Sequence, residues 1–312
     1  MTFEATFLNR PEYILQPKAL LRRLFRGREA TGSTEVVQLP WRLPIQVDTS
    51  NAIGRIISHH GLFEMSVVEA IFRLTTPADL FLDVGANIGY MSSAAVRAGA
   101  KKVLSFEPHP FIFRELTHNL SLWAETSAEI ADQIFARQEA ISDKVGTAQL
   151  RWPKLGFSEN TGISSLEGGQ NASDHDEAEV ATTTLTRIFE QCGEPIGVLK
   201  VDIEGHEMTA FRASEHLLRA GNVRDIIFED FCGMDSETSQ LLAGFGYSLF
   251  GLNRTLFGPV LLESAEAIAN FQTRSHERTA NFLATRDRQR ARERFSGRGF
   301  WCLGTKQAVI AH

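Results

Sequence analysis

The chain has 312 residues, 43% of them hydrophobic and 22% charged, which is the composition of a folded protein with a large core. Its formal net charge of −6 argues against a globally basic surface of the kind that binds nucleic acid, so no nucleic-acid partner is expected. The three cysteines lie far apart without C-x-x-C spacing, which argues against a disulfide framework or a zinc site and favours a reducing compartment.

Residues 1–75 are predicted to form a helical and extended N-terminal extension with lid helices, ahead of a main domain over residues 76–312. The start lacks the basic-then-apolar order of a secretory signal, and no apolar run reaches the roughly 18 residues that span a bilayer, so a cytoplasmic protein without an integral membrane segment is expected. Residues 18–28 predict a short amphipathic helix with a basic face. That face either lies in solvent or makes weak contact with an anionic membrane surface or substrate. Residues 36–47, with two prolines, predict an edge hairpin or an extended segment.

Residues 51–74 carry apolar side chains at helical spacing, interrupted near Gly61, and predict two helices. His59, His60 and Glu64 stand at the interruption. A helical lid over the main domain would place them near a ligand. The alternative, polar side chains at a helix junction on the surface, is favoured for the two histidines.

The rest of the chain alternates strands and helices, which predicts an α/β fold with a mostly parallel sheet covered by helices on both faces. Residues 155–179 lack periodicity and predict a mobile loop, and the arginine-rich residues 274–294 predict an exposed helix or a partly ordered insertion. The expected strands are 80–84, 102–106, 134–141, a hairpin strand at 146–152, 196–203, 225–228, 247–252 and a last strand at 300–304, and the expected helices are 90–98, one from residue 110, 183–192, 207–220 and 236–243.

A glycine-rich loop follows the first of these strands. Asp83 ends an apolar run, and Gly85, Asn87 and Gly89 precede an Ala-rich helix. Such glycines let backbone N–H groups approach a ligand. The pattern D-x-G-x-N-x-G places an acid where it would repel a pyrophosphate, so a nicotinamide dinucleotide is disfavoured, and the P-loop pattern is absent. An acid suits a ligand with an ammonium and a sulfonium, as in S-adenosylmethionine.

Glu107 stands 22 residues after Gly85, at the end of the second strand. An acid at this distance from a glycine loop accepts hydrogen bonds from ribose hydroxyls. Because ligands of open α/β sheets bind at the carboxyl ends of the strands, we expect the glycine loop and Glu107 to lie at one edge.

Charged residues also follow the strand at residues 196–203. Lys200, Asp202 and Glu204 alternate with apolar residues, and Gly205, His206 and Glu207 come next. Alternation places the first three on one side of an extended chain. They form either an internal ladder of ion pairs or a functional group that faces a ligand, and the position at a strand end favours the second.

Together these stretches resemble the FkbM-type methyltransferase family over about residues 61–228. The matching residues are 83–89, 106–108, 119–120, 140–143 with Gly146, 200–205 with Glu207, and 226–229. The resemblance implies a three-layer, Rossmann-like, seven-stranded class I methyltransferase fold over residues 76–312. It also implies S-adenosylmethionine as the methyl donor and O-methylation of a hydroxyl, often on a sugar, glycolipid or polyketide-type small molecule.

The resemblance also assigns roles to single residues. Asp202 would lie nearest the transferred methyl group, with Glu204 and His206 toward the acceptor, where we rank Asp202 and His206 first as the general base. The cofactor would be held by Asp83, Gly85, Asn87, Gly89 and Glu107, with Ser142 and Asp143 bordering the adenine.

Two alternatives remain open. In a metal-assisted O-methyltransferase, Asp202, Glu204 and Glu229 would supply oxygen ligands, but Lys200 beside them would neutralise their charge, so no metal is expected. A non-catalytic binding module would keep the fold and use its acidic loop for a partner. The intact glycine loop and Glu107 argue against the module. The expected partner is a small-molecule or glycan acceptor.

Overall fold

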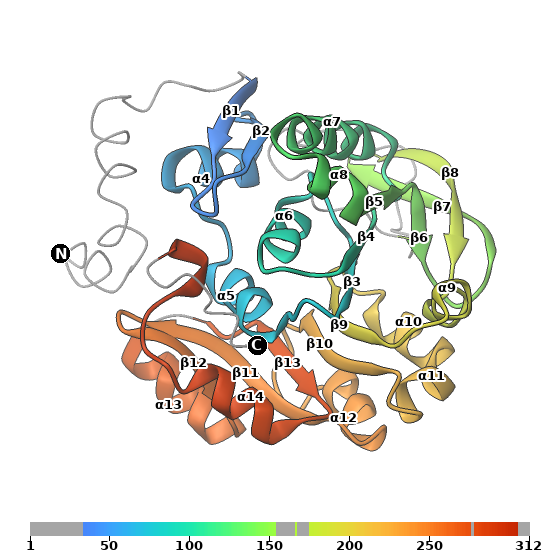
Figure 1. Ribbon diagram of the computed structural model, residues 1–312. Helices are drawn as coiled ribbons and strands as arrows, with labels where there is room; N and C mark the ends of the chain where they lie inside the picture. Colours follow the sequence, from blue (N-terminus) through green and yellow to red (C-terminus); the bar gives the residue numbers. More distant parts are fainter. Residues whose placement is uncertain (1–33, 154–165, 167–174, 276–277, 305–312) are drawn as a thin grey trace.

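The computed structural model describes residues 34–153, 166, 175–275 and 278–304. Its centre is an eight-stranded sheet in the order β12-β11-β13-β10-β9-β3-β4-β5, with helices on both faces (Figure 1). The predicted α/β class is therefore confirmed. The strands are β3 (Leu80–Val84), β4 (Lys102–Phe106), β5 (Ile134–Arg137), β9 (Ile196–Val201), β10 (Val223–Glu229), β11 (Ser248–Thr255), β12 (Gly258–Leu262) and β13 (Asn281–Thr285).

The sheet is mostly parallel, as predicted. Strands β5, β4, β3, β9 and β10 run parallel to one another, whereas β13 runs antiparallel to both β10 and β11. Seven strands, from β11 to β5, make up the expected sheet, and β12 adds an eighth at its edge through a tight hairpin with β11. The carboxyl ends of β3, β4, β9 and β10 consequently lie side by side.

Alternating side chains of the central strands fill two cores. Phe81 and Val103 belong to the core under α5 and α6, whereas Leu82 and Leu104 belong to the core under α10, α11 and α12, on the opposite face (Figure 1). This follows from the two-residue period of an extended chain. The helices are α4 (Ala52–His60), α5 (Met65–Leu74), α6 (Tyr90–Arg97), α7 (Pro110–Thr126), α8 (Ala128–Gln133), α9 (Leu185–Cys192), α10 (Glu207–Ala213), α11 (Glu215–Arg219), α12 (Glu237–Gly244), α13 (Ala265–Ser275) and α14 (Arg288–Phe295).

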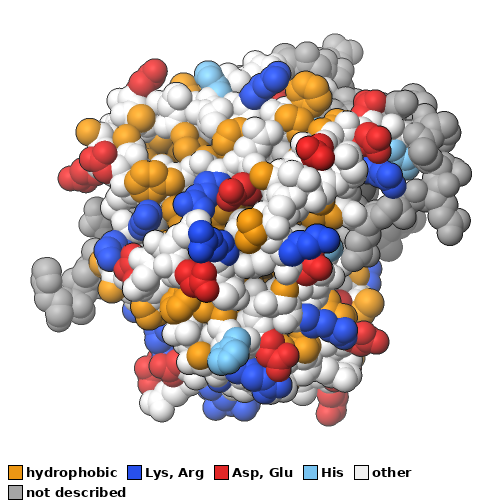
Figure 2. Space-filling view, turned by 90° about the vertical axis from the view of Figure 1, so that its right-hand side faces the viewer, with side chains coloured by type: hydrophobic (Ala, Val, Ile, Leu, Met, Phe, Trp, Pro, Cys, Tyr) orange, Lys and Arg blue, Asp and Glu red, His pale blue; other side chains and the backbone are white. Residues whose placement is uncertain are grey.

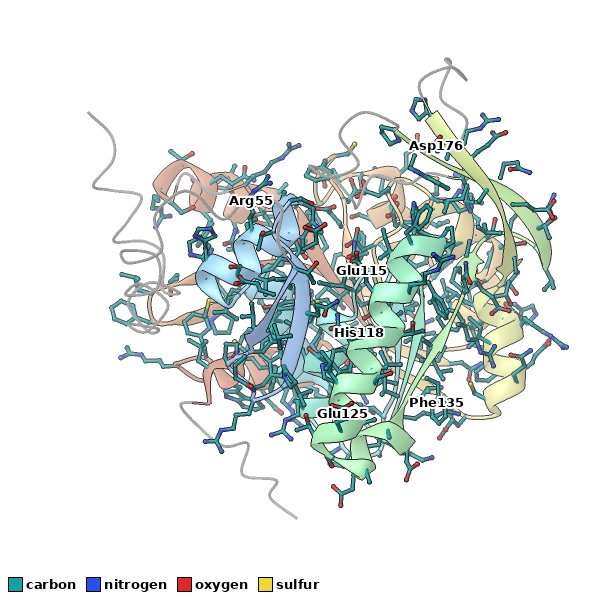
Figure 3. The ribbon with its side chains drawn as sticks, turned by 90° about the horizontal axis from the view of Figure 1, so that it is seen from above. Arg55, Glu115, His118, Glu125, Phe135 and Asp176 are labelled. Atoms are coloured by element: carbon teal, nitrogen blue, oxygen red, sulfur yellow. The ribbon has the colours of Figure 1, made fainter. Side chains whose placement is uncertain are left out.

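The N-terminal hairpin packs against α7. Strands β1 (Thr34–Gln38) and β2 (Pro44–Asp48) pair antiparallel as a separate two-stranded sheet, not as an edge of the main sheet. The Trp123 indole donates a hydrogen bond to the Pro44 carbonyl at 2.5 Å, and the Gln46 backbone N–H donates to Asn119 at 2.7 Å. Figure 3 shows the hairpin alongside α7, whose Glu115, His118 and Glu125 are labelled. The predicted basic helix at residues 18–28 lies outside the described residues.

Two expected elements around β5 differ in the structure. The expected strand 134–141 is divided at Gln138 into β5 and β6 (Glu139–Ile141), which belongs to a second sheet of order β6-β8-β7. Strand β7 (Gly146–Pro153) pairs with β8 (His175–Thr183) and not with β6. Residues 175–179 are thus strand, and the rest of the predicted loop 155–179, apart from Leu166, lies outside the described residues.

The C-terminal part corrects two further expectations. Residues 274–294 were expected to be an exposed helix or insertion, but they contain β13, which enters the sheet between β10 and β11, and α14. Among the described residues the last strand is therefore β13, whereas Trp301–Leu303 form a 3-10 turn. The expected helix 207–220 is divided at Ser214 into α10 and α11. The high arginine content suggests a solvent-exposed segment, but these arginines form ion pairs with Asp225 and Glu263.

The visible surface carries mixed charge. On the face in Figure 2, Lys and Arg side chains alternate with Asp and Glu side chains. None of the helices in the described ranges is long and apolar enough to cross a membrane.

Candidate functional site

A cavity of about 250 Å³ opens at the carboxyl ends of β3, β4, β9 and β10. Residues 84–88, 106–108 and 202–204 line it, together with Glu229. The edge predicted from the order of strands and helices is therefore the edge that holds the cavity. Parallel strands place their polar terminal loops together, so residues far apart in sequence meet here.

The glycine loop packs tightly against the end of β9. Gly85 has φ 76°, and a Cβ atom there would lie 1.8 Å from the Asp202 carbonyl oxygen, so no side chain fits. Asn87 also adopts a left-handed conformation, and its side chain accepts a hydrogen bond from the Ile88 N–H at 2.8 Å. Gly89 lies outside the cavity lining and packs against Leu116 and Trp123 of α7. Gly85 and Asn87 thus form the cavity wall, and Gly89 supports it.

Asp83 lies behind this wall, fully buried, and does not line the cavity. Its Oδ2 accepts a hydrogen bond from Ser92 Oγ at 2.5 Å. Its Oδ1 lies 3.8 Å from Lys200 Nζ and has no hydrogen-bond donor in the described part of the chain. Burial raises the pKa of Asp83, although Lys200 and Ser92 oppose this rise. The structure places the carboxylate under the loop, beside Lys200 and outside the cavity lining.

Glu107 lines the cavity beside the loop, as predicted. Its two carboxylate oxygens accept hydrogen bonds from the backbone N–H groups of Asn87 and His109, each at 2.9 Å. Burial raises the pKa of Glu107 to about 7, although these hydrogen bonds favour the ionised form. The carboxylate is therefore fixed in orientation, and each oxygen retains a lone pair for a ligand hydroxyl.

His109 supports Glu107 from outside the lining and was not predicted from the sequence. Its Nδ1 accepts from the backbone N–H groups of Phe111 and Ile112, at 3.3 and 3.4 Å, and caps the N-terminus of α7. Burial lowers the pKa of His109 to about 4, so the ring is neutral at physiological pH and can accept these bonds. Its position just before Pro110 was the available signal, because proline favours the first helical position.

Lys200 connects β9 with the glycine loop. Its Nζ lies 3.0 Å from the Gly85 carbonyl oxygen and 3.2 Å from Asp202 Oδ2. Burial lowers the pKa of Lys200, but the charges of Asp202, Asp83 and Glu64 more than offset this and leave it raised. The predicted ladder therefore exists between Lys200 and Asp202.

The ladder does not continue to Glu204, because β9 ends at Val201 and Glu204 has φ 52°. Glu204 nevertheless lines the cavity. Burial and the charges of Asp202 and Glu207 raise the pKa of Glu204 to about 7.

The structure joins His206 to Ser142. His206 Nε2 and Ser142 Oγ lie 3.0 Å apart, and Ser142 Oγ also donates to Asp143 Oδ1 at 3.1 Å. His206 lines the cavity, whereas Ser142 is buried behind it and Asp143 is exposed outside it. Among the residues of β6, Glu139, Ala140 and Ile141 reach the lining.

Glu64 and Glu229 complete an acidic end of the cavity with Asp202 and Glu204. Glu64 precedes α5 with left-handed backbone angles, and burial, more than the nearby Asp202, raises its pKa to about 7. Burial and the charges of Asp202 and Glu64 raise the pKa of Glu229 to about 8. His59 and His60 are not among the lining residues.

Within the described ranges, no group of three or more His, Cys, Asp or Glu side chains is arranged to hold a metal ion. The charge of Lys200 opposes the rise in the pKa of Glu64 and of Glu204. The site therefore offers fixed acids, one lysine and a tight backbone loop.

Comparison with known proteins gives a consistent assignment. The model of the family described as the methyltransferase FkbM domain matches residues 83–249. The hexuronic acid methyltransferase AglP of Haloferax volcanii is 27% identical over 199 residues, which cover 63% of this chain and 74% of AglP.

Solved structures give lower similarity. A methyltransferase FkbM from Methylobacillus flagellatus aligns with 15% identity and a TM-score of 0.41, over 67% of this chain and 44% of that one. This chain therefore spans less than half the length of that protein. An O-methyltransferase from Bacillus cereus, solved in complex with SAH, aligns with 11% identity and a TM-score of 0.36, over 71% of this chain and 80% of that one.

Proposed function

The chain belongs to the methyltransferase FkbM family, and from this premise we propose that it transfers the methyl group of S-adenosylmethionine to a hydroxyl of a sugar-containing acceptor. The observation that carries the proposal is the Glu107 carboxylate, which lines the cavity next to the Gly85–Asn87 turn with both oxygens oriented by backbone N–H groups. This is the arrangement that holds the two hydroxyls of a ribose. The relative AglP is named for a hexuronic acid, which supports a sugar as the acceptor class.

The residues present fit this cofactor. Gly85 lets the loop pack directly on the end of β9, since a side chain there would collide with the Asp202 carbonyl. Glu107 would hold the ribose, and Asp202 would face the cationic sulfonium. Ser142 and Asp143 would border the adenine from β6, with Ser142 kept in place by His206. When bound, the cofactor supplies an activated methyl group that needs no further electrophilic assistance.

The chain itself must then align the acceptor, exclude water and take up a proton. Asp202, Glu204 and His206 line the cavity and are the candidates for the proton acceptor. His206 shares a hydrogen bond with Ser142, so its ring orientation is fixed before the acceptor binds. The pKa of Glu204 is raised to about 7, so this carboxylate can accept a proton near neutral pH. Glu204 also lines the cavity.

Titration calorimetry with S-adenosylhomocysteine tests the cofactor assignment. We expect Glu107→Ala to weaken binding by about 10-fold to 100-fold, because hydrogen bonds to a charged group contribute about 1.5–3 kcal/mol. The control is Glu125→Gln, an exposed carboxylate on α7 that should leave binding unchanged. Equal affinity of Glu107→Ala and the parent, with both folded by circular dichroism, would contradict the ribose role.

Transfer is tested with a methyl-labelled cofactor and a panel of glycosides. A methyl ether on a sugar hydroxyl survives mild alkali, whereas a methyl ester on a sugar carboxylate is hydrolysed. Alkali-stable label in the glycoside supports the proposal. Tight cofactor binding without label transfer to any sugar would instead favour a different acceptor or a binding module.

A further inference from the structure

We propose that Glu64 and Glu229 make the acceptor end of the cavity select an uncharged sugar over one that bears a carboxylate. This inference rests on the proposed function, whose acceptor class it narrows. Glu64 lies outside the segment 83–249 that matches the family, whereas Glu229 lies within it.

The first support for the inference is the excess of acidic over basic side chains among the described lining residues. The acidic end of the cavity consists of Glu64, Asp202, Glu204 and Glu229. The basic side chains among the described lining residues are those of Lys200 and His206. A carboxylate on the acceptor would add a further negative charge beside these acidic side chains, which disfavours its binding.

Neither basic side chain is placed to compensate such a carboxylate. Lys200 already contacts the Gly85 carbonyl at 3.0 Å, Asp202 at 3.2 Å and Asp83 at 3.8 Å. Two of its three N–H donors are used by the Gly85 carbonyl and Asp202, and its positive charge is already offset by Asp202 and the buried Asp83. His206 Nε2 is engaged with Ser142 at 3.0 Å.

The positions of Glu64 and Glu229 are fixed by the surrounding chain. The Phe63 N–H donates a hydrogen bond to Tyr90 Oη at 2.9 Å, which holds the residue before Glu64 over the cavity. Glu229 ends β10 and faces Asn281 of β13 in register, and the Asn281 side chain hydrogen-bonds Glu64. Both carboxyls therefore belong to one edge of the cavity, formed by three separate segments.

An uncharged sugar matches this edge better than an acid does. Burial and the charge of Asp202 raise the pKa of Glu64 to about 7 and that of Glu229 to about 8. Near neutral pH the pair thus holds both protonated and ionised carboxyls, which donate and accept hydrogen bonds with hydroxyls. An acceptor carboxylate adds repulsion and offers no donor.

The test compares three 4-nitrophenyl glycosides that differ at one carbon: a β-glucuronide, the corresponding glucuronamide and a β-glucoside. Binding of each to the full chain saturated with S-adenosylhomocysteine is measured by calorimetry at pH 8. We expect the glucuronide to bind at least about tenfold more weakly than the isosteric, uncharged glucuronamide.

Substitutions of the two glutamates test whether they cause the difference in affinity between the glucuronide and the glucuronamide. Glu64→Gln and Glu229→Gln should each reduce the difference to about threefold or less, since each removes one repelling charge and keeps the shape. Glu125→Gln on the exposed face of α7 is the control and should leave the difference unchanged. Lowering the pH to 6 should also narrow the gap in the parent, because the two carboxyls then carry protons.

The outcomes are separable. A glucuronide that binds as tightly as the glucuronamide overturns the selectivity and leaves the proposed function intact. If no glycoside binds while S-adenosylhomocysteine does, the sugar acceptor and this inference both fall. Absence of S-adenosylhomocysteine binding overturns the cofactor assignment.

Discussion

Buried acids occur at both ends of the central sheet, but they are matched by cations at one end only. Where β3 and β10 begin, Asp79 accepts two hydrogen bonds from Arg224, each at 2.8 Å. Asp225 pairs with Arg224 and with Arg290, each at 2.9 Å. At the carboxyl ends of the strands, the cavity acids share Lys200.

The difference separates structural acids from functional ones. Buried charges that are paired and hydrogen-bonded fix one arrangement of the chain. An excess of acids over cations costs folding energy through repulsion, and such an excess is typical of a site that awaits a ligand. The same residue types therefore stabilise the fold at one end of the sheet and, in the proposed function, serve the chemistry at the other.

Removing Arg73 should have the largest effect on stability. Its guanidinium pairs with Glu69 at 2.6 Å inside the protein, and it donates to the carbonyls of Arg294, Gly297 and Gly299. Arg73→Met leaves an unpaired buried carboxylate, and we expect the free energy of unfolding to fall by about 3–5 kcal/mol. Urea denaturation measures this.

The matched control is Arg219→Met. Arg219 pairs with Glu215 at the same spacing and the same 2.6 Å distance, but both side chains are about half exposed. A loss of at most about 1 kcal/mol is expected there. Comparable losses for the two variants would contradict the role of burial.

Lys200→Met should have an intermediate effect on stability and a larger one on binding. The substitution removes the cation that faces Asp83 and Asp202 and the donor to the Gly85 carbonyl. We expect a loss of about 2–3 kcal/mol, less than for Arg73→Met because the cavity acids can take up protons. S-adenosylhomocysteine affinity should fall at least about tenfold by calorimetry, whereas the folded fraction of Arg73→Met should keep its affinity.

The smallest expected effect is a pH dependence of stability that arises from the acids lining the cavity. The pKa values of Glu64, Glu204 and Glu229 are raised from 4.5 to about 7, 7 and 8 in the folded protein. Between about pH 4.5 and pH 8 the folded state therefore binds more protons than the unfolded state. Stability should consequently be greatest below about pH 5 for these groups, and their contribution should be lost as the pH rises toward 8.

Glu229→Gln should flatten this slope and raise the melting temperature of the unliganded protein at pH 8 by about 1–2 °C. Differential scanning calorimetry from pH 5.5 to 8.5 provides the measurement, with Glu125→Gln as the unaffected control. A slope that is the same in Glu229→Gln as in the parent would show that the repulsion lies elsewhere.

Much of the central sheet could be predicted from local sequence. The expected strands at residues 80–84 and 102–106 match β3 and β4 in both bounds, because each is a short apolar run closed by turn residues. The strands at the chain's end could not be found this way. Strand β13 is short and surrounded by arginines whose acidic partners come from β10 and from the segment after β12.

The candidate site shows the same division. Glu107 and the glycine loop were predicted because their spacing within one strand–helix–strand unit fixes their positions. Glu64 was noticed at a helix break, but its place in the cavity depends on a hydrogen bond between Phe63 and Tyr90, 27 residues away. Asp83 was expected beside the ligand, and the structure places it behind the loop.

The sequence by itself determined the parallel sheet, the edge where polar loops gather and the family of the chain. These depend on local periodicity and on motifs whose residues lie close together. Only the tertiary structure decided which acids are neutralised and which remain in excess. Ion pairing acts through space over a few ångströms, and Arg224 and Arg290 pair with carboxylates that lie 145 and 65 residues away in the sequence.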